Sequence, residues 1–271
     1  MSRVFLMMGE SGTGKTTCAL SGPKPINYYE FDAGSLERAS AGLKLSEADI
    51  VPRYYYAPLT NLLDPGKISV GERGGIAPAT VHKLEGWREL FWQFVADYLP
   101  ALNGPGYPVI DTATKLWLCI RQAFLQEVQE AAGPEKERLN QLQYTEPNAR
   151  HNQIIEAAKI KGKDLVLLSH EKELWLNDKP TGNIVPDSYK ELTNMADCSL
   201  RFKLRDKKPV ATIYKAGTGG LELLGMEIVE PTLDKLNTLL DAATTLRREG
   251  IPFEGMQADE VMQAAAMMKD K

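Results

Sequence analysis

The octet from Gly9 to Thr16, GESGTGKT, constrains the fold of this 271-residue chain more than any other feature. It matches the phosphate-loop pattern G-x-x-x-x-G-K-S/T in full. The apolar segment from Arg3 to Met8 before it reads as a strand, and the segment from Lys15 to Leu20 reads as a helix. A phosphate loop connects a strand to a helix in this way, because its backbone and the helix N-terminus together surround the phosphates. We therefore predict that the chain begins with the first strand and helix of an α/β sheet.

Residues 9–17 are the candidate contacts for nucleotide phosphates. Their glycines let backbone N–H groups turn inward, and the helix that follows adds positive potential. Lys15 is expected to reach the β and γ phosphates, and the Thr16 hydroxyl is expected to hold Mg²⁺. We therefore predict ATP and Mg²⁺ as cofactors. The predicted contacts are Gly9, Glu10, Ser11, Gly12, Thr13, Gly14, Lys15, Thr16 and Thr17.

Two further predicted strands end at a polar residue that could serve the phosphates. Asp111 ends the strand that starts at Tyr107, and a carboxylate at this Walker B position is expected to hold the metal together with Thr16. His170 follows the apolar strand 164–169. A histidine at a strand tip could sense the γ-phosphate and move the connection that follows it. The alternative is an ordinary surface histidine.

Hydrolysis needs a group that orients or deprotonates the attacking water, and two acids near the end of strand 26–32 are the candidates. The alternation of side chains along a strand puts Glu30 and Asp32 on one face. We favour Asp32, because it is nearer to the C-terminal edge where open α/β sheets bind their ligands. The alternative is that Asp32 caps the turn before Ala33 and Gly34.

Strands and helices alternate up to residue 170, which predicts a mostly parallel central sheet with helices on both faces. Strands at 198–204 and 210–214 flank a turn and predict a C-terminal antiparallel hairpin at the sheet edge. Segment 170–194 is expected to be a polar connection, and the Gly- and Pro-rich stretch 64–78 is expected to be an exposed loop. The other expected elements are a strand near 53–58 and helices at 87–99, 112–130, 148–161 and 231–248.

Length and composition fit one α/β core with a short appendage. We expect the core at residues 1–225 and an acidic helical extension at 226–271. Cys18, Cys119 and Cys198 form no C-x-x-C pair, so neither a disulfide framework nor a zinc site is expected. Because the chain has no apolar run long enough to span a membrane and no signal-peptide core, we expect a cytoplasmic protein without a membrane partner.

The net charge of -4 argues against a protein coated in basic residues for indiscriminate nucleic-acid binding. The charge is distributed unevenly. From Lys159 to Lys215 there are 12 Lys and Arg residues against 8 Asp and Glu residues, a local excess of +4. A site for a polyanion is therefore expected in this later segment.

The order of these features resembles that of RecA and RadA recombinases. The resemblance is greatest to compact phage-encoded RecA-core ATPases, which include proteins that promote single-strand annealing. It extends over about residues 3–215. The segments that carry it are GESGTGKTT, PKPINYYEFDAGS, YPVIDTATKLW, LVLLSHEKE and ADCSLRFKLR.

The resemblance implies a RecA-like P-loop ATPase that acts on single-stranded DNA in phage-type recombination, annealing or repair, in a bacterial or phage-infected cell. Asp32 would stand where such proteins have a catalytic glutamate, and His170 where they often have a glutamine that senses the γ-phosphate. Lys215 on the final hairpin would complete the ATP site of a neighbouring subunit. The resemblance thus implies a homo-oligomer, and a single-strand DNA-binding protein is a further expected partner.

The two DNA-binding loops of the family would fall at about residues 133–147 and 170–194. Basic residues mixed with aromatic ones suit a single strand, because they neutralise phosphates and stack on bases. Both loops also carry acids, such as Glu135 and Glu137 in the first. The predicted nucleic-acid contacts are Lys136, Arg138, Lys172, Trp175, Lys179 and Lys190.

Two other function classes stay open. A phosphate loop alone does not distinguish transfer of phosphate to water from transfer to a substrate, so a kinase of a small molecule or nucleotide is one alternative. Arg121, Arg138 and Arg150 are dispersed, which disfavours a kinase with an arginine-bearing lid. The other alternative is a non-catalytic assembly protein that holds ATP as a structural ligand.

Overall fold

The computed structural model describes residues 2–43, 45–46, 48–58, 83–133, 136, 138–217 and 220–269. The main sheet has eight strands: β1 (Val4–Gly9), β2 (Ile26–Glu30), β3 (Ile50–Tyr54), β4 (Tyr107–Asp111), β5 (Leu165–Ser169), β8 (Cys198–Arg205), β9 (Lys208–Ala216) and β10 (Glu227–Val229). Their order across the sheet is β10-β9-β8-β1-β5-β4-β2-β3. Strand β5 therefore lies between β1, which leads into the phosphate loop, and β4, which ends at Asp111.

The pairs from β3 across to β8 are all parallel, whereas β9 is antiparallel to β8 and β10 is antiparallel to β9. The fold class predicted from the sequence, a mostly parallel central sheet with helices on both faces and a C-terminal antiparallel hairpin, is thus confirmed. The hairpin itself is not the sheet edge, because β10 pairs with its outer strand. Strand β10 is only three residues long, and such a short strand carries no alternation that a sequence pattern could reveal.

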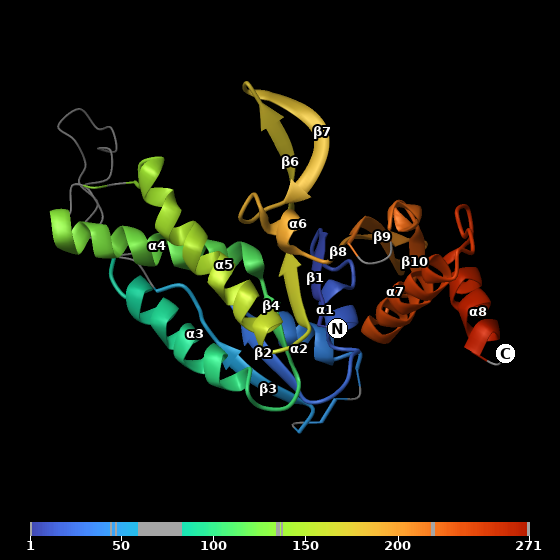
Figure 1. Ribbon diagram of the computed structural model, residues 1–271. Coiled ribbons are helices and arrows are strands. Elements are labelled where there is room, and N and C mark those ends of the chain that lie inside the picture. Colours follow the sequence, from blue (N-terminus) through green and yellow to red (C-terminus); the bar gives the residue numbers. More distant parts are fainter. Residues whose placement is uncertain are drawn as a thin grey trace.

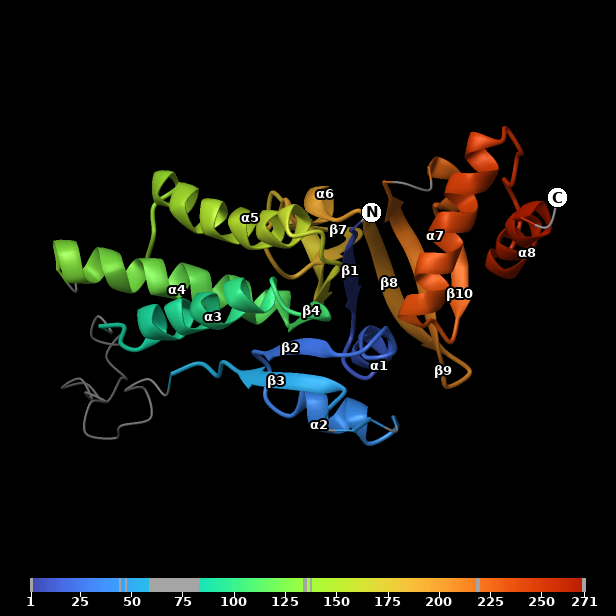
Figure 2. The same cartoon turned by 60° about the horizontal axis from the view of Figure 1, so that its bottom comes forward.

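Helices cover both faces of the sheet, as Figures 1 and 2 show. On one face lie α1 (Lys15–Ala19), α2 (Ser35–Ser40), α7 (Leu233–Arg248) and α8 (Ala258–Lys269). On the other face lie α3 (Trp87–Ala101), α4 (Ala113–Ala132), α5 (Thr145–Ile160) and α6 (Leu192–Met195). Two short 3-10 helices, Leu142–Tyr144 and Leu221–Leu223, lie in connections. Of the described helices, none combines the length and the apolar character needed to cross a membrane.

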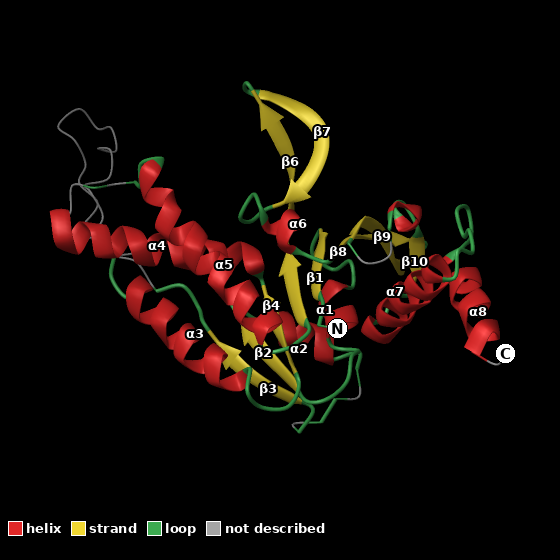
Figure 3. Cartoon of the chain, viewed as in Figure 1, coloured by secondary structure: helices red, strands yellow, loops and turns green. Residues whose placement is uncertain are grey.

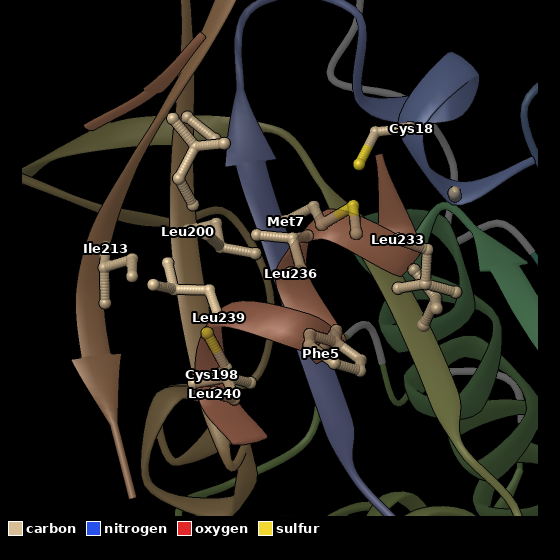
Figure 4. Packing of buried hydrophobic residues seen from close by; sticks show 14 of the residues in the cluster. Phe5, Met7, Cys18, Cys198, Leu200, Ile213, Leu233, Leu236, Leu239 and Leu240 are labelled. Atoms are coloured by element: carbon tan, nitrogen blue, oxygen red, sulfur yellow. The ribbon is translucent and has the colours of Figure 1, made fainter. Parts of the chain in front are cut away.

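Strand β1 contributes to the hydrophobic cores on both faces because successive side chains of a strand point in opposite directions. Phe5 and Met7 belong to the core under α7, and Val4 and Leu6 belong to the core under α3, α4 and α5. Figure 4 shows the side chains of α7, among them Leu236, directed at β1, β8 and β9. All six residues of β1 are buried. A strand that is buried on both faces gives the phosphate loop a rigid base.

The chain beyond residue 225 takes part in this core. Strand β10 extends the main sheet, and α7 supplies buried leucines such as Leu239 to the same cluster as β1. Thr232 caps α7 by accepting a hydrogen bond from the backbone N–H of Lys235. The division into a core at 1–225 and an extension at 226–271 remains a prediction about domains.

Segment 170–194 is not the polar connection that the sequence predicts. It contains β6 (Glu171–Leu176) and β7 (Lys179–Pro186), which form a separate antiparallel sheet of two strands. Figure 3 shows this pair, which we call the ribbon, projecting away from the main sheet. Its turn residues Asn177 and Asp178 have φ values of 51° and 59°, the left-handed conformation of a tight hairpin turn. Strand β6 begins with charged residues and shows no apolar alternation, so the strand pattern is absent from the sequence. The Asn-Asp dipeptide was a usable signal of the turn.

Other boundaries differ by a few residues. Strand β2 ends at Glu30 rather than residue 32, and β3 spans Ile50–Tyr54 rather than 53–58. Helix α5 begins at Thr145, inside the segment predicted to be the first DNA loop. The predicted loop 64–78 lies outside the described residues.

His151 on α5 is a titratable group inside the core. It is 1% exposed, and its ring packs against those of Trp117 and Tyr189, with centroid distances of 5.8 and 5.2 Å. Neither ring nitrogen has a hydrogen-bond partner in the described part of the chain. Burial lowers the pKa of His151 from 6.5 to about 4. The folded protein therefore holds this imidazole in its neutral form.

We predict that His151 makes the protein less stable in mild acid. The pKa of His151 in the folded protein lies below the unfolded value of 6.5. Its contribution to the unfolding free energy is therefore complete above pH 6.5 and is lost as the pH falls towards about 4. Between pH 7 and pH 5, this loss should be about 2 kcal/mol of unfolding free energy. Urea unfolding of His151→Phe should show a pH dependence weaker by that amount, whereas His170→Gln should keep it. An unchanged dependence in His151→Phe would contradict the assignment.

Candidate nucleotide site

The phosphate loop fits closely against β8 and the start of β9. Gly9 has φ 150°, and a Cβ atom there would lie 2.5 Å from the carbonyl oxygen of Phe202. Gly14 has φ 92°, and a Cβ atom there would lie 2.8 Å from Cγ of Pro209. Both positions therefore require glycine, for conformation and for space.

Lys15 lies inside the loop and is 7% exposed. Its ammonium group donates to the carbonyl oxygens of Gly9 and Glu10 at 2.8 and 2.7 Å. Burial lowers the pKa of Lys15, and the carboxylates of Asp111, Glu171 and Glu10 act in the opposite direction. The Lys15 ammonium group is bonded to two uncharged carbonyl oxygens. Its positive charge can therefore bind an anion that enters the loop.

Asp111 lies at the end of β4, as predicted, and is 3% exposed. Its Oδ2 atom accepts hydrogen bonds from the hydroxyls of Thr16 at 3.0 Å, Ser35 at 2.7 Å and Tyr28. Three hydroxyl donors on one oxygen fix the orientation of this buried carboxylate. The sequence predicted Thr16 and Asp111 but not Tyr28 or Ser35, since nothing in a pattern of separate segments shows which hydroxyls meet.

The donor set around Asp111 fits a magnesium ion. Carboxylate and hydroxyl oxygens are hard ligands, and Mg²⁺ usually takes one or two of them together with substrate phosphates and water. The described residues contain no group of three or more His, Cys, Asp and Glu side chains that could hold a metal by themselves. Thr16 and Asp111 are therefore the residues that would hold Mg²⁺ beside bound phosphates.

Asp32 and His170 meet at the edge of the same cleft. Nε2 of His170 lies 3.5 Å from Oδ2 of Asp32, and the side chains are 35% and 37% exposed. The backbone N–H of Asp32 reaches the carbonyl oxygen of Asp111 at 3.3 Å, which brings the end of β2 to the end of β4. The cleft has a volume of about 280 Å³. Its lining includes Ser11 to Thr17, Asp32, Ser35, Arg38, Ala39, Asp111, Thr112 and His170.

Glu30, the other candidate for water activation, does not line this cleft. It is 1% exposed, and its Oε1 accepts the backbone N–H of Ser35 at 3.0 Å. Burial raises its pKa. Because β2 ends at Glu30, strand alternation does not relate it to Asp32. The sequence also missed Arg38, which lies on α2 beside the cleft.

Lys215 on β9 has all three of its donors engaged within its own chain. Its ammonium group donates to the carbonyl oxygens of Thr193, Asn194 and Ala196 at 3.0, 2.7 and 2.8 Å. These carbonyls belong to α6 and the residue after it, so Lys215 caps the end of that helix. Burial lowers the pKa of Lys215. A role in a neighbour's ATP site remains a prediction.

The predicted nucleic-acid contacts form two separate groups. Lys172, Trp175 and Lys179 lie on the ribbon, and Lys190 follows it as an exposed residue. Trp175 is 59% exposed, and Lys172 pairs with Asp187 at 2.8 Å.

Lys136 and Arg138 form the other group. They follow the far end of α4, which lies away from the ribbon in Figures 1 and 2. Glu135 and Glu137, beside them, lie outside the described residues. The ribbon is therefore the part of the molecule in which several predicted contacts come together.

No family model and no curated protein matches the sequence. The solved structures to which the chain is similar include the following two. One is the crystal structure of the RadB recombinase, at 15% identity, covering 84% of this chain and 86% of that one with a TM-score of 0.48. The other is the flagellar accessory protein FlaH from Methanocaldococcus jannaschii, at 13% identity, covering 84% of each chain with a TM-score of 0.41. Both identities are low, so the RecA-like fold rests on the strand order and phosphate loop of this chain, and the phage-type subgroup remains a prediction.

Gly12 and Gly14 of the phosphate loop differ in their surroundings, so we predict that replacing them by alanine lowers the free energy of unfolding by different amounts. Gly12 and Gly14 both have positive φ, 78° and 92°, but only Gly14 faces Pro209, and Gly12 has open space around it. The left-handed conformation costs an alanine about 1 kcal/mol, so Gly12→Ala should lose about that much stability. Gly14→Ala should lose about 3 kcal/mol, because overpacking against Pro209 adds to it. Urea unfolding measures both variants, and equal losses would contradict the contact.

Proposed function

We propose that this chain is a magnesium-dependent ATPase of RecA-like fold that acts on single-stranded DNA in recombination, annealing or repair. The observation that carries the ATPase part is the 3.0 Å contact between the hydroxyl of Thr16 in the phosphate loop and the carboxylate of Asp111. A phosphate loop joined to a buried strand-end carboxylate is the arrangement that phosphoryl transfer requires. The expected setting is the cytoplasm of a bacterial or phage-infected cell.

In the proposed mechanism, the backbone N–H groups of residues 9–17 and the ammonium group of Lys15 bind the phosphates. Lys15 exchanges its bonds to the carbonyls of Gly9 and Glu10 for bonds to phosphate oxygens. Thr16 and Asp111 would hold Mg²⁺, which would supply positive charge to the bound phosphates. These groups stabilise the negative charge that spreads over the γ-phosphate oxygens during transfer.

Asp32 is proposed to accept a proton from the attacking water. The water oxygen forms a bond to the γ-phosphorus while the bond from that phosphorus to the β-phosphate oxygen breaks, so that ADP and phosphate leave. The exposure of Asp32 to the cleft supports this role, whereas the Glu30 carboxylate is buried away from the cleft and accepts a backbone N–H. His170, 3.5 Å from Asp32, is suited to orient that carboxylate and to respond to the γ-phosphate.

The DNA part of the proposal rests on the ribbon. Trp175 is 59% exposed, and exposed aromatic rings stack on the bases of a single strand. Lys179 lies on the neighbouring strand, and the exposed Lys190 follows the ribbon. Association into a homo-oligomer with the ATP site between subunits, and cooperation with a single-strand DNA-binding protein, belong to the same proposal. In that oligomer, Lys215 is proposed to act on a neighbour's site.

The ATPase mechanism predicts a contrast between two acids. Asp32→Asn should lower kcat for ATP hydrolysis by about a hundredfold or more, the usual contribution of a general base. Glu30→Gln, its matched control, should keep kcat within about tenfold, because Glu30 does not line the cleft. Lys15→Ala should abolish ATP binding or hydrolysis. Steady-state hydrolysis measures all three, and a Glu30→Gln loss as large as that of Asp32→Asn would reverse the assignment.

The DNA part predicts that single-stranded DNA stimulates hydrolysis and that added salt weakens the stimulation. Trp175→Ala should lower affinity for a single strand about tenfold, because base stacking on one ring contributes about 1–3 kcal/mol. Trp92→Ala is the control, since Trp92 is also exposed, at 49%, but lies on α3. The readouts are fluorescence anisotropy of a labelled oligonucleotide and ATP turnover.

The alternatives give other results in the same assays. Turnover that needs a small phosphate acceptor would indicate a kinase. ATP binding without any turnover would indicate an assembly protein with ATP as a structural ligand. Turnover that DNA does not change would leave the ATPase and remove the DNA part.

A further inference from the structure

A partly buried ion pair joins the ribbon to the main sheet. Arg201 on β8 donates from Nε and Nη2 to the two carboxylate oxygens of Glu171, at 2.8 and 3.0 Å. The two side chains are 17% and 11% exposed. Within the described ranges, no other ion pair connects β6 or β7 to the main sheet. A two-stranded sheet is only marginally stable alone, so such an attachment determines where the ribbon lies.

Both partners of this pair are next to the nucleotide site. Arg201 lies opposite Met8 in the β1–β8 register, and the next pair joins Phe202 to Gly9, the first residue of the phosphate loop. Glu171 directly follows His170. The Glu171 carboxylate is also one of the charges that raise the pKa of Lys15 against the effect of burial. The attachment of the ribbon therefore lies beside the phosphate loop.

The backbone of His170 is held from several sides. Its N–H donates to Oγ1 of Thr114 on α4 at 3.1 Å, and its carbonyl oxygen accepts the N–H of Asp187 at 2.8 Å. The ion pair between Glu171 and Arg201 adds a third contact, at the residue after His170. The imidazole of His170 lies 3.5 Å from the Asp32 carboxylate, so a small shift of residues 170–171 would change that contact.

We propose that Glu171 and Arg201 form a positioning pair that holds His170 against Asp32 and thereby sets the rate of ATP hydrolysis. The inference rests on the proposed function, because it needs Asp32 and His170 to act on the attacking water. Neither Glu171 nor Arg201 touches the nucleotide in this proposal. They act through the geometry of residue 170, where a displacement of about 1 Å can cost a hundredfold in rate.

The test is a double-mutant cycle in the full chain, with Glu171→Gln, Arg201→Gln and the double variant. Each single change should lower kcat for ATP about tenfold or more and alter KM by less than about threefold. The double variant should be no slower than the slower single variant, because the two side chains act as one unit. Arg205→Gln is the control: it lies on the same strand as Arg201, breaks the exposed pair with Glu227 and should leave kcat near that of the unaltered protein.

Three results would overturn the proposal. They are an unchanged kcat in both single variants, effects that multiply in the double variant, and a change confined to KM, which would make Glu171 an electrostatic partner of Lys15 instead. If the unaltered protein hydrolyses ATP but the cycle shows no coupling, only this inference fails. If it hydrolyses no ATP, the proposed function fails as well.

Hydrogen exchange distinguishes a local change in the ribbon from a general loss of folding in the variants. In Glu171→Gln, the amides of residues 171–186 should exchange faster, while those of β1 should keep their protection. Equal exchange of the ribbon amides in the variant and the unaltered protein would show that the pair does not hold the ribbon. Arg201→Lys should give an intermediate kcat, because it keeps the charge but loses the two-point contact.

Discussion

The central position of β1 is the constraint on which the rest of the structure depends. The strand is paired with β5 on one side and β8 on the other, and every one of its residues is buried. Its last residue, Gly9, begins the phosphate loop and lies against the backbone of Phe202. The hydrogen bonds and apolar packing around β1 therefore fix the position of the loop. Any group that serves the phosphates has to come from the strand ends beside it.

Those strand ends explain why residues far apart in the chain share one cleft. Parallel strands β4, β5 and β2 present their carboxyl ends at the same edge, so Asp111, His170 and Asp32 meet around Lys15. The Asp111 carboxylate links three elements, since its hydroxyl donors come from α1, α2 and β2. The carboxylates of Asp111, Glu171 and Glu10 oppose the effect of burial on the pKa of the Lys15 ammonium group.

The ribbon is the part whose form could not be read from local patterns. Its first strand begins with Glu171, Lys172 and Glu173, so it lacks the apolar alternation that reveals a half-buried strand. Its position depends on a partner thirty residues away, Arg201, and on the end of β5. Because the ribbon starts one residue after His170, the backbone connects the nucleotide site directly to the ribbon.

The sequence by itself determined the phosphate loop, the parallel α/β sheet, and the candidacy of Lys15, Thr16, Asp111 and Asp32, because these depend on local spacing and on side-chain periodicity. Only the tertiary structure decided which of the acids faces the cleft, that Ser35 and Tyr28 join Asp111, and that Lys215 binds carbonyls of α6 and of the residue after it. Each of these depends on contacts between residues distant in the chain. Such contacts are set by strand order and packing, which no local pattern encodes.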